Sequence, residues 1–311
     1  MRVKALSHYD GDKDTRFGDC ILGFSGSKLM IYDCGHERHA DEVKEFLKKN
    51  TGISDVSIVV SHDDSDHSDG VVKLMEHLNE GNWTVTLYTH LYLKDVDEIH
   101  KMLDDGRRKK NKTCEHILEV FENIAKIVTT AEEYGYTVKS ALPDTDVGLG
   151  QVVGPTKEEF IPVVAKAIEE DGQGTIDGET VMNAASIQVK CTLDDGMEVL
   201  LCGDATPKYI HDIESYDIIQ LPHHGQLDDA QMIFDSLEDP YCKEFLISDN
   251  TGSGYNSGGS DKLVKKMKQE KFTPAHNTKE GIVELPKEKV SRGVGHKNTA
   301  GVRLGGLDCR C

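Results

Sequence analysis

One dense run of potential metal ligands constrains this chain more than any other feature of its sequence. Within the segment 61–70, SHDDSDHSDG, four such side chains fall within six residues: His62, Asp64, Asp66 and His67. The run follows the apolar residues 58–60, which are typical of a buried strand. A loop at a strand end can aim several side chains at one point, and imidazole and carboxylate groups suit zinc, manganese or iron. The segment therefore predicts a metal centre.

Three other predicted strands also end in side chains of these types, at Asp33, at Asp204 and at the pair His223–His224. Taken alone, the first cluster could be a polar turn, Asp204 could cap a helix and the histidine pair could lie in a surface loop. Taken together, they are better explained as one site, because binding residues gather at the strand ends of rigid scaffolds.

Length and composition are ordinary for a globular protein. At 311 residues the chain can form one large domain or two small ones, and 37% of its residues are hydrophobic and 29% charged. No apolar stretch approaches the roughly 18 residues needed to span a bilayer, and residues 1–8 lack the apolar core of a secretory signal. We therefore expect a cytoplasmic protein without membrane partners. Its eight cysteines include several in strand-like runs and do not indicate a disulfide scaffold.

The formal net charge of −19 argues against a strong general DNA-binding surface, because nucleic-acid binders usually present a basic face. The charge does not exclude a phosphodiester substrate, however. Two divalent cations would add about four positive charges at the site itself.

Strand-like and helix-like segments alternate along the chain, which predicts an α/β protein with layers of sheet covered by helices. We expect one domain over residues 1–285, helical insertions at about 95–135 and 155–178, and a C-terminal tail over 286–311 for which no role can be derived. The strands expected to carry or flank the site are 20–24, 28–32, 58–61, 83–92, 186–192, 197–202, 218–221 and 245–248.

The order of these elements resembles the metallo-β-lactamase-fold hydrolase superfamily over roughly residues 1–285. Its usual motif His-x-His-x-Asp-His stands here as His62-x-Asp64-x-Asp66-His67, with Asp in place of the second His. This variant is most similar to the hydrolase domain of bacterial competence (DNA-uptake) channel proteins and its stand-alone relatives. The segments that also match that group are 18–21, 31–35, 183–186, 203–205, 221–225 and 280–283.

The resemblance implies a four-layer αββα sandwich with a dinuclear metal site, holding Zn²⁺ in the first instance and Mn²⁺ as the alternative. One metal would take His62 and Asp64, and the other would take Asp66, His67 and His224, with Asp204 bridging the two. Asp33 would orient a ligand through a hydrogen bond. His223 would lie near the substrate as an acid or as a donor to the transition state, and Asp66 and His223 are the predicted catalytic residues. A further ligand is expected between the first cluster and Asp204, with His90 and Asn183 as the candidates.

The expected function is that of a metal-dependent hydrolase, in which two metals activate a water molecule for attack on a phosphodiester of a nucleic acid or nucleotide. This phosphodiesterase or nuclease assignment depends on analogy with the family. Two alternatives stay open, hydrolysis of an amide, lactone or thioester and a non-enzymatic binding module on the same fold. The sequence also leaves open whether the chain forms a homo-oligomer.

Overall fold

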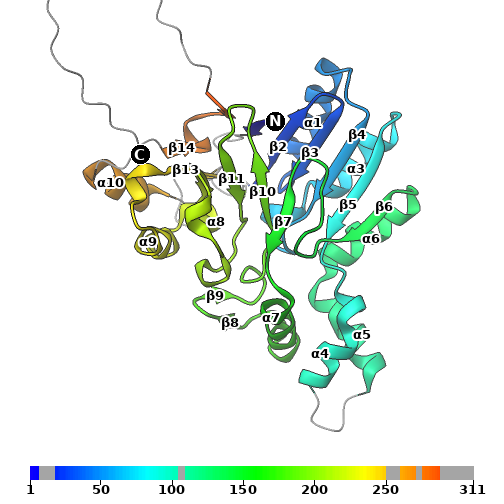
Figure 1. Ribbon diagram of the computed structural model, residues 1–311. Helices are drawn as coiled ribbons and strands as arrows, with labels where there is room; N and C mark the ends of the chain where they lie inside the picture. Colours follow the sequence, from blue (N-terminus) through cyan, green and yellow to red (C-terminus); the bar gives the residue numbers. More distant parts are fainter. Residues whose placement is uncertain (7–17, 104–108, 250–259, 271–274, 288–311) are drawn as a thin grey trace, which may run out of the picture.

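The computed structural model describes residues 1–6, 18–103, 109–249, 260–270 and 275–287 (Figure 1). Nearly all of the predicted tail 286–311 therefore lies outside the described residues. The strands form two large sheets and one short hairpin. The order of the first sheet is β15-β1-β2-β3-β4-β5-β6, and that of the second is β14-β13-β12-β11-β10-β7.

The first sheet carries the N-terminal half of the predicted site. Its strands are β1 (Arg2–Ala5), β2 (Ile21–Ser25), β3 (Lys28–Tyr32), β4 (Asp55–Val59), β5 (Thr84–Thr89), β6 (Thr137–Ser140) and β15 (Val283–Leu285). The second sheet carries the C-terminal half. Its strands are β7 (Gln151–Gly154), β10 (Gln188–Thr192), β11 (Glu198–Leu201), β12 (Ile218–Gln220), β13 (Glu244–Ile247) and β14 (Ala275–Asn277), and the separate hairpin is β8 (Thr175–Ile176) with β9 (Glu179–Thr180).

Helices cover the outer faces of both sheets (Figure 1). The α-helices are α1 (Glu37–Lys49), α2 (Ser65–Ser68), α3 (Val71–Asn79), α4 (Val96–Met102), α5 (Lys110–Val120), α6 (Glu122–Glu133), α7 (Lys157–Glu169), α8 (Pro222–Gly225), α9 (Leu227–Ser236) and α10 (Asp261–Glu270). Short 3₁₀ helices are η1 (Tyr92–Asp95), η2 (Pro207–Tyr209), η3 (Ile213–Ser215), η4 (Pro240–Cys242) and η5 (Thr278–Glu280). None of the described helices is long and apolar enough to cross a membrane.

Side-chain alternation along the strands builds the layers, since successive residues of a strand face opposite sides of the sheet. In β3, Leu29 and Ile31 pack under α1 and α3, whereas Met30 and Tyr32 pack between the two sheets. Strand β11 continues the pattern on the other side of the molecule. Its Val199 and Leu201 face the first sheet, and Leu200 faces α9 and α10. Both faces of these two strands are therefore buried, and the predicted αββα layered fold class is confirmed.

Parallel pairing brings the predicted strand-end residues to one edge of the sandwich. Strands β3, β4 and β5 run parallel, as do β11, β12 and β13. Because the carboxyl ends of parallel strands meet at the same edge, the segments that follow β3, β4, β11 and β12 converge there. The predicted strand 83–92 is wrong at its end, because β5 stops at Thr89 and the chain turns at His90 into η1.

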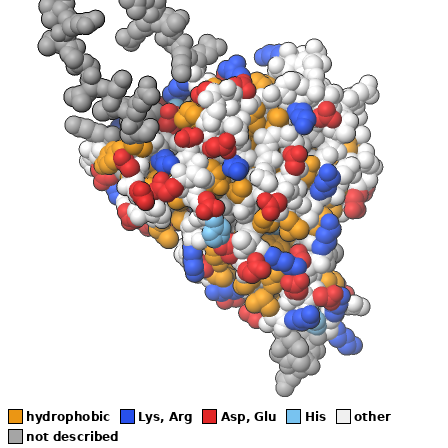
Figure 2. All heavy atoms as spheres, in the orientation of Figure 1, with side chains coloured by type: hydrophobic (Ala, Val, Ile, Leu, Met, Phe, Trp, Pro, Cys, Tyr) orange, Lys and Arg blue, Asp and Glu red, His pale blue; other side chains and the backbone are white. Residues whose placement is uncertain are grey.

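Charged side chains on the face of the molecule drawn in Figure 2 show both signs interspersed rather than a continuous basic patch. The chain has 55 acidic and 36 basic residues, so acidic groups outnumber basic ones overall. On that face, interspersed charges of both signs do not form a continuous positive field that would steer a polyanion.

Candidate metal centre

Backbone hydrogen bonds clamp the loop that carries the first ligand cluster. The carbonyl oxygen of Asp66 accepts from the backbone N–H of Asp19 at 2.9 Å, and that of His67 accepts from Cys34 at 3.1 Å. Two glycines allow this close approach. A Cβ added to Gly18 or to Gly35 would lie 1.5 or 1.7 Å from the carbonyl oxygen of Asp66. The loop is thus fixed between the start of β2 and the end of β3.

Three predicted ligand histidines are anchored through Nδ1, which turns Nε2 toward the interior of the site. Nδ1 of His62 lies 2.9 Å from Oγ of Ser61, and Nδ1 of His67 lies 2.8 Å from Oδ2 of Asp33. His224 is held in the same way. Its Nδ1 lies 2.9 Å from the carbonyl oxygen of Ser248 and 3.1 Å from Oδ1 of Asp19. A metal-binding histidine is typically held by such a bond at its other ring nitrogen.

The freed Nε2 atoms converge on the carboxylate of Asp204. Nε2 of His67 lies 3.3 Å from Oδ1 of Asp204, and Nε2 of His224 lies 3.9 Å from its Oδ2. Ligand atoms of His62, His67 and Asp204 all lie within 4.8 Å of one another. Although Nε2 of both His62 and His67 and Oδ1 of Asp204 are buried, none has a hydrogen-bond partner among the described residues.

Unpartnered buried polar atoms cost free energy unless something else binds them. Imidazole nitrogens and a carboxylate oxygen that face one point form a donor set typical of zinc and related divalent metals. The residues present therefore fit a metal ion at this edge of the sandwich.

The two remaining carboxylates of the first cluster lie at the margin of this group. Oδ2 of Asp66 lies 3.2 Å from Nε2 of His224, and its role as a metal ligand stays a prediction. Asp64 is half-buried, and burial together with the charge of Asp66 raises its pKa to about 6. Among the described residues, three groups of potential ligands have atoms within 4.8 Å of one another, and Asp64 belongs to none of them, so its assignment to a metal stays a prediction.

Electrostatics couple the members of the group strongly. Burial opposes the ionisation of Asp204, yet the nearby charges of His67 and His224 hold its pKa well below the ordinary value. Burial also opposes protonation of His67, but the carboxylates of Asp204 and Asp33 raise its pKa well above the ordinary value. Burial and the charge of His67 lower the pKa of His62 to about 4. Such shifts within one small volume are characteristic of functional sites.

The Nδ1 atom of His223 faces a pair of carboxylates that is separate from the histidine Nε2 atoms around Asp204. This Nδ1 lies 3.1 Å from Oε1 of Glu179 on β9 and 4.0 Å from Oδ2 of Asp229 on α9. Burial opposes protonation, but the hydrogen bond that Nδ1–H donates to Glu179 and the charge of Asp204 raise the pKa of His223 to about 8. At neutral pH the His223 ring is therefore mostly in its doubly protonated, positively charged form.

The two candidates for an additional ligand have different surroundings. Nε2 of His90 lies 2.9 Å from the carbonyl oxygen of Ala185, and its ring stacks on Phe160, so the structure does not bring it into the cluster. Nδ2 of Asn183 lies 3.4 Å from Oδ2 of Asp204, and its Oδ1 is buried without a hydrogen-bond partner in the part of the chain that the structure describes. Of the two, Asn183 is the one beside the site.

Strained backbone marks the same strand ends. Asp33, His223 and His224 have φ values of 59°, 51° and 56° and lie in the left-handed region. This conformation is unfavourable for residues other than glycine, at roughly 1–3 kcal/mol each, and persists only where surrounding contacts enforce it. Here the contacts that hold the backbone are the hydrogen bonds that orient these three side chains.

Sequence reasoning missed four residues of the site. Ser61 and Asp19 support His62 and His224, while Glu179 and Asp229 flank His223. Ser61 and Asp19 were within reach of sequence analysis, because each belongs to a segment already singled out. Glu179 lies beyond the predicted insertion 155–178 in no recognised pattern, and nothing in the sequence signalled Asp229.

We expect Asp33→Asn to weaken metal affinity by roughly 10- to 100-fold while the protein stays folded. The buried carboxylate accepts from the backbone N–H and the hydroxyl of Ser61, at 2.7 Å each, besides facing His67. An amide would place N–H groups against donors and release His67. Competition with a chromogenic chelator measures the affinity, and the exposed Asp55→Asn is the control. Equal affinities for the two variants would contradict this role.

Comparisons with known proteins add little to this geometry. No family model and no curated protein matches the chain. Among solved structures it is similar to the metallo-β-lactamase fold protein YhfI from Bacillus subtilis, at 14% identity over 89% of this chain and 95% of that chain, with a TM-score of 0.46.

Two further solved structures are similar at the same low level. Human tRNase Z, short form, has 15% identity over 74% of this chain and 80% of its own, with a TM-score of 0.38. A metallo-β-lactamase from Cronobacter sakazakii has 14% identity over 83% of this chain and 81% of its own, with a TM-score of 0.34. At such identities and TM-scores, the interpretation of the site depends on its own residues.

Proposed function

We propose that this protein is a metal-dependent hydrolase that holds two divalent cations, Zn²⁺ or Mn²⁺, and cleaves a phosphodiester. One observation carries the proposal. Three histidines from two distant segments of the chain, His62 and His67 in one loop and His224 in another, have Nδ1 anchored and gather at the buried carboxylate of Asp204. The groups that would hold the cations are His62, Asp64, Asp66, His67, Asp204 and His224.

When bound, two divalent cations supply the positive charge that acidifies a water molecule and stabilises charge developing on the attacked group. The protein's own contribution is to fix the donors. The clamped loop of Asp66 and His67 cannot move independently of β2 and β3, because its carbonyl oxygens are bonded to both. Preorganised groups of this kind avoid the cost of reorganisation during the reaction.

His223 is the group suited to deliver a proton to a leaving group. With Nδ1 directed at Glu179, its Nε2 is available for donation. The side chain is partly exposed, at 26%, whereas Glu179 is 5% exposed, so the ring can meet a substrate while its carboxylate support stays protected. General acid catalysis by a positioned histidine typically contributes about 10²- to 10⁴-fold.

The choice of a phosphodiester depends on chemistry and on resemblance. Carboxylates among the donors make a harder site than three histidines would, and such a site tolerates manganese as well as zinc. The motif His62-x-Asp64-x-Asp66-His67 is also most similar to that of the competence-channel hydrolase domains. A nucleic acid or nucleotide is therefore the substrate class that we propose.

A substrate screen on metal-loaded protein tests this proposal. We expect turnover of bis(p-nitrophenyl) phosphate and no turnover of a panel of lactones, thioesters and amides. The variant Asp66→Ala should remain folded and lose the activity. Lactone, thioester or amide hydrolysis without phosphodiester hydrolysis would replace the proposed substrate class, and undiminished turnover by Asp66→Ala would refute the site.

Glu179→Gln is expected to impair cleavage selectively when the leaving group is poor. The amide keeps the shape of the side chain but removes the negative charge that holds the proton on His223, 3.1 Å away. We expect kcat to fall by about 10- to 100-fold for an alkyl leaving group and to change little for p-nitrophenolate, which needs no proton. An equal loss for both leaving groups, or reduced metal content, would indicate a merely structural role.

A further inference from the structure

A cavity of about 530 Å³ lies among the helices of the predicted insertion 95–135, apart from the candidate metal centre. It is bounded by residues of η1, α5 and α6, of which Figure 1 shows α6 beside β6 of the first sheet and α5 below it. We call it the insertion pocket. Its volume falls in the range of roughly 300–1,000 Å³ that is typical of small-molecule sites.

The lining of the insertion pocket is mostly apolar. Ile117, Phe121 and Ile124 form part of it and are almost fully buried, whereas Leu118 remains 45% exposed. An exposed leucine beside an apolar hollow leaves hydrophobic surface in contact with water, and a ligand with an apolar body would cover it.

Two lysines give the insertion pocket a positive character. Lys94 and Lys126 line it, and neither forms an ion pair with any residue in the described part of the chain. The nearby Lys157, by contrast, is paired with both Asp95 and Glu98. Among the described residues that line the pocket, Glu132 is the only acidic one. In a chain of net charge −19, two unpaired ammonium groups at an apolar hollow favour an anionic ligand.

Aromatic rings separate this pocket from the candidate metal centre. Tyr92 and Phe121 stack with ring centroids 3.9 Å apart, and both line the pocket together with His90. On their other side, the same three residues line a void of about 10 Å³ that His62 also borders. A ligand in the pocket therefore faces the rings and not the metal-binding atoms.

The loop of the metal centre is nonetheless bonded to the wall of the pocket. The backbone N–H of Ile124 donates to Oδ1 of Asp63 at 2.7 Å, and Nδ2 of Asn123 donates to the Asp63 carbonyl oxygen at 2.8 Å. Asp63 lies between two predicted metal ligands in the sequence. The pocket thus borders the segment that supports the site without being part of it.

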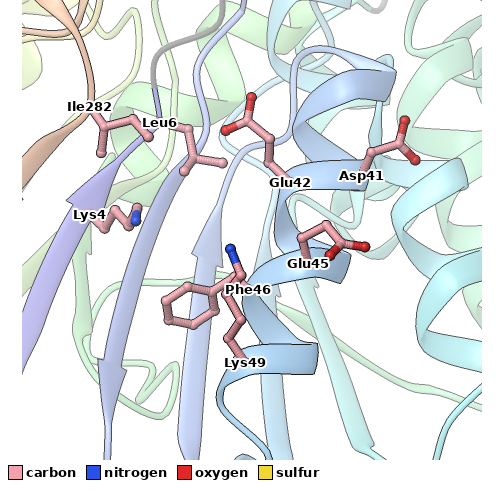
Figure 3. Close-up of a pocket in the computed structure, with 8 residues that line it drawn as sticks. All are labelled: Lys4, Leu6, Asp41, Glu42, Glu45, Phe46, Lys49 and Ile282. Atoms are coloured by element: carbon pink, nitrogen blue, oxygen red, sulfur yellow. The ribbon is translucent and has the colours of Figure 1, made fainter.

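We propose that the insertion pocket binds an amphipathic anion, with an acyl or aryl body against Leu118 and Phe121 and a carboxylate or phosphate head near Lys94 and Lys126. This binding does not depend on the proposed function, because the four residues placed against the ligand are not predicted metal ligands. A second hollow, of about 310 Å³ between β1 and α1 (Figure 3), makes a useful contrast. Carboxylates and lysines both line this hollow, and its Lys4 is already paired with Glu284. The hollow therefore favours neither an anionic nor a cationic ligand.

Titration of the full-length protein with anilinonaphthalene sulfonate, an amphipathic fluorescent anion, tests the proposal. We expect saturable binding at one site, unchanged when metal is removed by a chelator, and a higher unfolding temperature for the complex. Dodecanoate and dodecyl phosphate should compete, and the stronger of the two identifies the head group. Dodecanol should compete far more weakly. Equal competition by dodecanol, or no saturable binding, would overturn the proposal.

The double variant Lys94→Glu and Lys126→Glu should bind the probe about tenfold more weakly. Its matched control is the double variant Lys262→Glu and Lys265→Glu, which makes the same charge change at two exposed positions of α10. Ala125→Trp, which fills the pocket from α6, should abolish binding without loss of helix content by circular dichroism. If both double variants bound the probe equally weakly, a small-molecule site would be contradicted. The same would follow if light scattering showed a dimer of the wild type and Leu118→Asp dissociated it.

Discussion

Replacing Asp204 by Asn is expected to reduce turnover at least about 10³-fold while leaving the fold intact. The carboxylate lies 3.3 Å from Nε2 of His67 and 3.9 Å from Nε2 of His224, so it is the group on which the histidines converge. An amide of the same shape keeps the packing but removes the negative charge and halves the number of acceptor oxygens. The steady-state rate on bis(p-nitrophenyl) phosphate measures the effect.

The control for this variant is Asp228→Asn, which makes the same chemical change at an exposed position of α9. We expect its turnover to equal that of the wild type. Circular dichroism and thermal unfolding should show that both variants are folded, because neither substitution creates a cavity. If Asp204→Asn retained wild-type turnover, the converging histidines would need another explanation.

Replacing Gly18 by Ala is expected to destabilise the protein by at least about 2 kcal/mol and to displace the ligand loop. The new Cβ would lie 1.5 Å from the carbonyl oxygen of Asp66 and 2.7 Å from the Cα of Gly35. Both neighbours are backbone atoms, which cannot rotate away as a side chain could. The loop must therefore shift, and the bond from the Asp19 N–H to the Asp66 carbonyl oxygen at 2.9 Å must break.

Chemical denaturation measures this loss, and Gly52→Ala is the matched control. A Cβ at Gly52 would meet nothing within 4 Å, so its effect should stay within about 0.5 kcal/mol. We also expect Gly18→Ala to bind metal more weakly, since Asp66 and His67 belong to the displaced loop. Equal stabilities of the two variants would show that the clamp does not hold the loop.

The convergence of strand ends could be predicted because it depends only on local patterns. Apolar runs that end in Asp or His predicted the positions of Asp33, His62 and Asp204, and parallel strands bring such ends to one edge. The supporting role of Asp33 was also anticipated, and the structure shows its bond to His67. The grouping of atoms was less predictable. Ligand atoms of His62, His67 and Asp204 lie within 4.8 Å of one another, whereas the expected pairing joined His62 to Asp64.

Contacts across long sequence separations could not be predicted. Asp19 contacts His224 although 205 positions separate them in the sequence, and Glu179 contacts His223 at a separation of 44. No periodic pattern in the sequence links either pair. Only the folded sandwich brings β2 beside the turn after β12. His90 illustrates the opposite error. A histidine at a strand end was a reasonable candidate ligand, yet stacking on Phe160 and a bond to the Ala185 carbonyl oxygen turn it elsewhere.

Metal titration of the stripped protein tests the central claim most directly, because it measures the converging donors without assuming any substrate. Isothermal calorimetry with Zn²⁺ or Mn²⁺ should give two equivalents per chain for the wild type, together with a higher unfolding temperature. Asp204→Asn should lose at least one equivalent, and Asp228→Asn should lose none. A wild-type protein that takes up no metal, and whose unfolding temperature does not change on addition of either ion, would contradict the account.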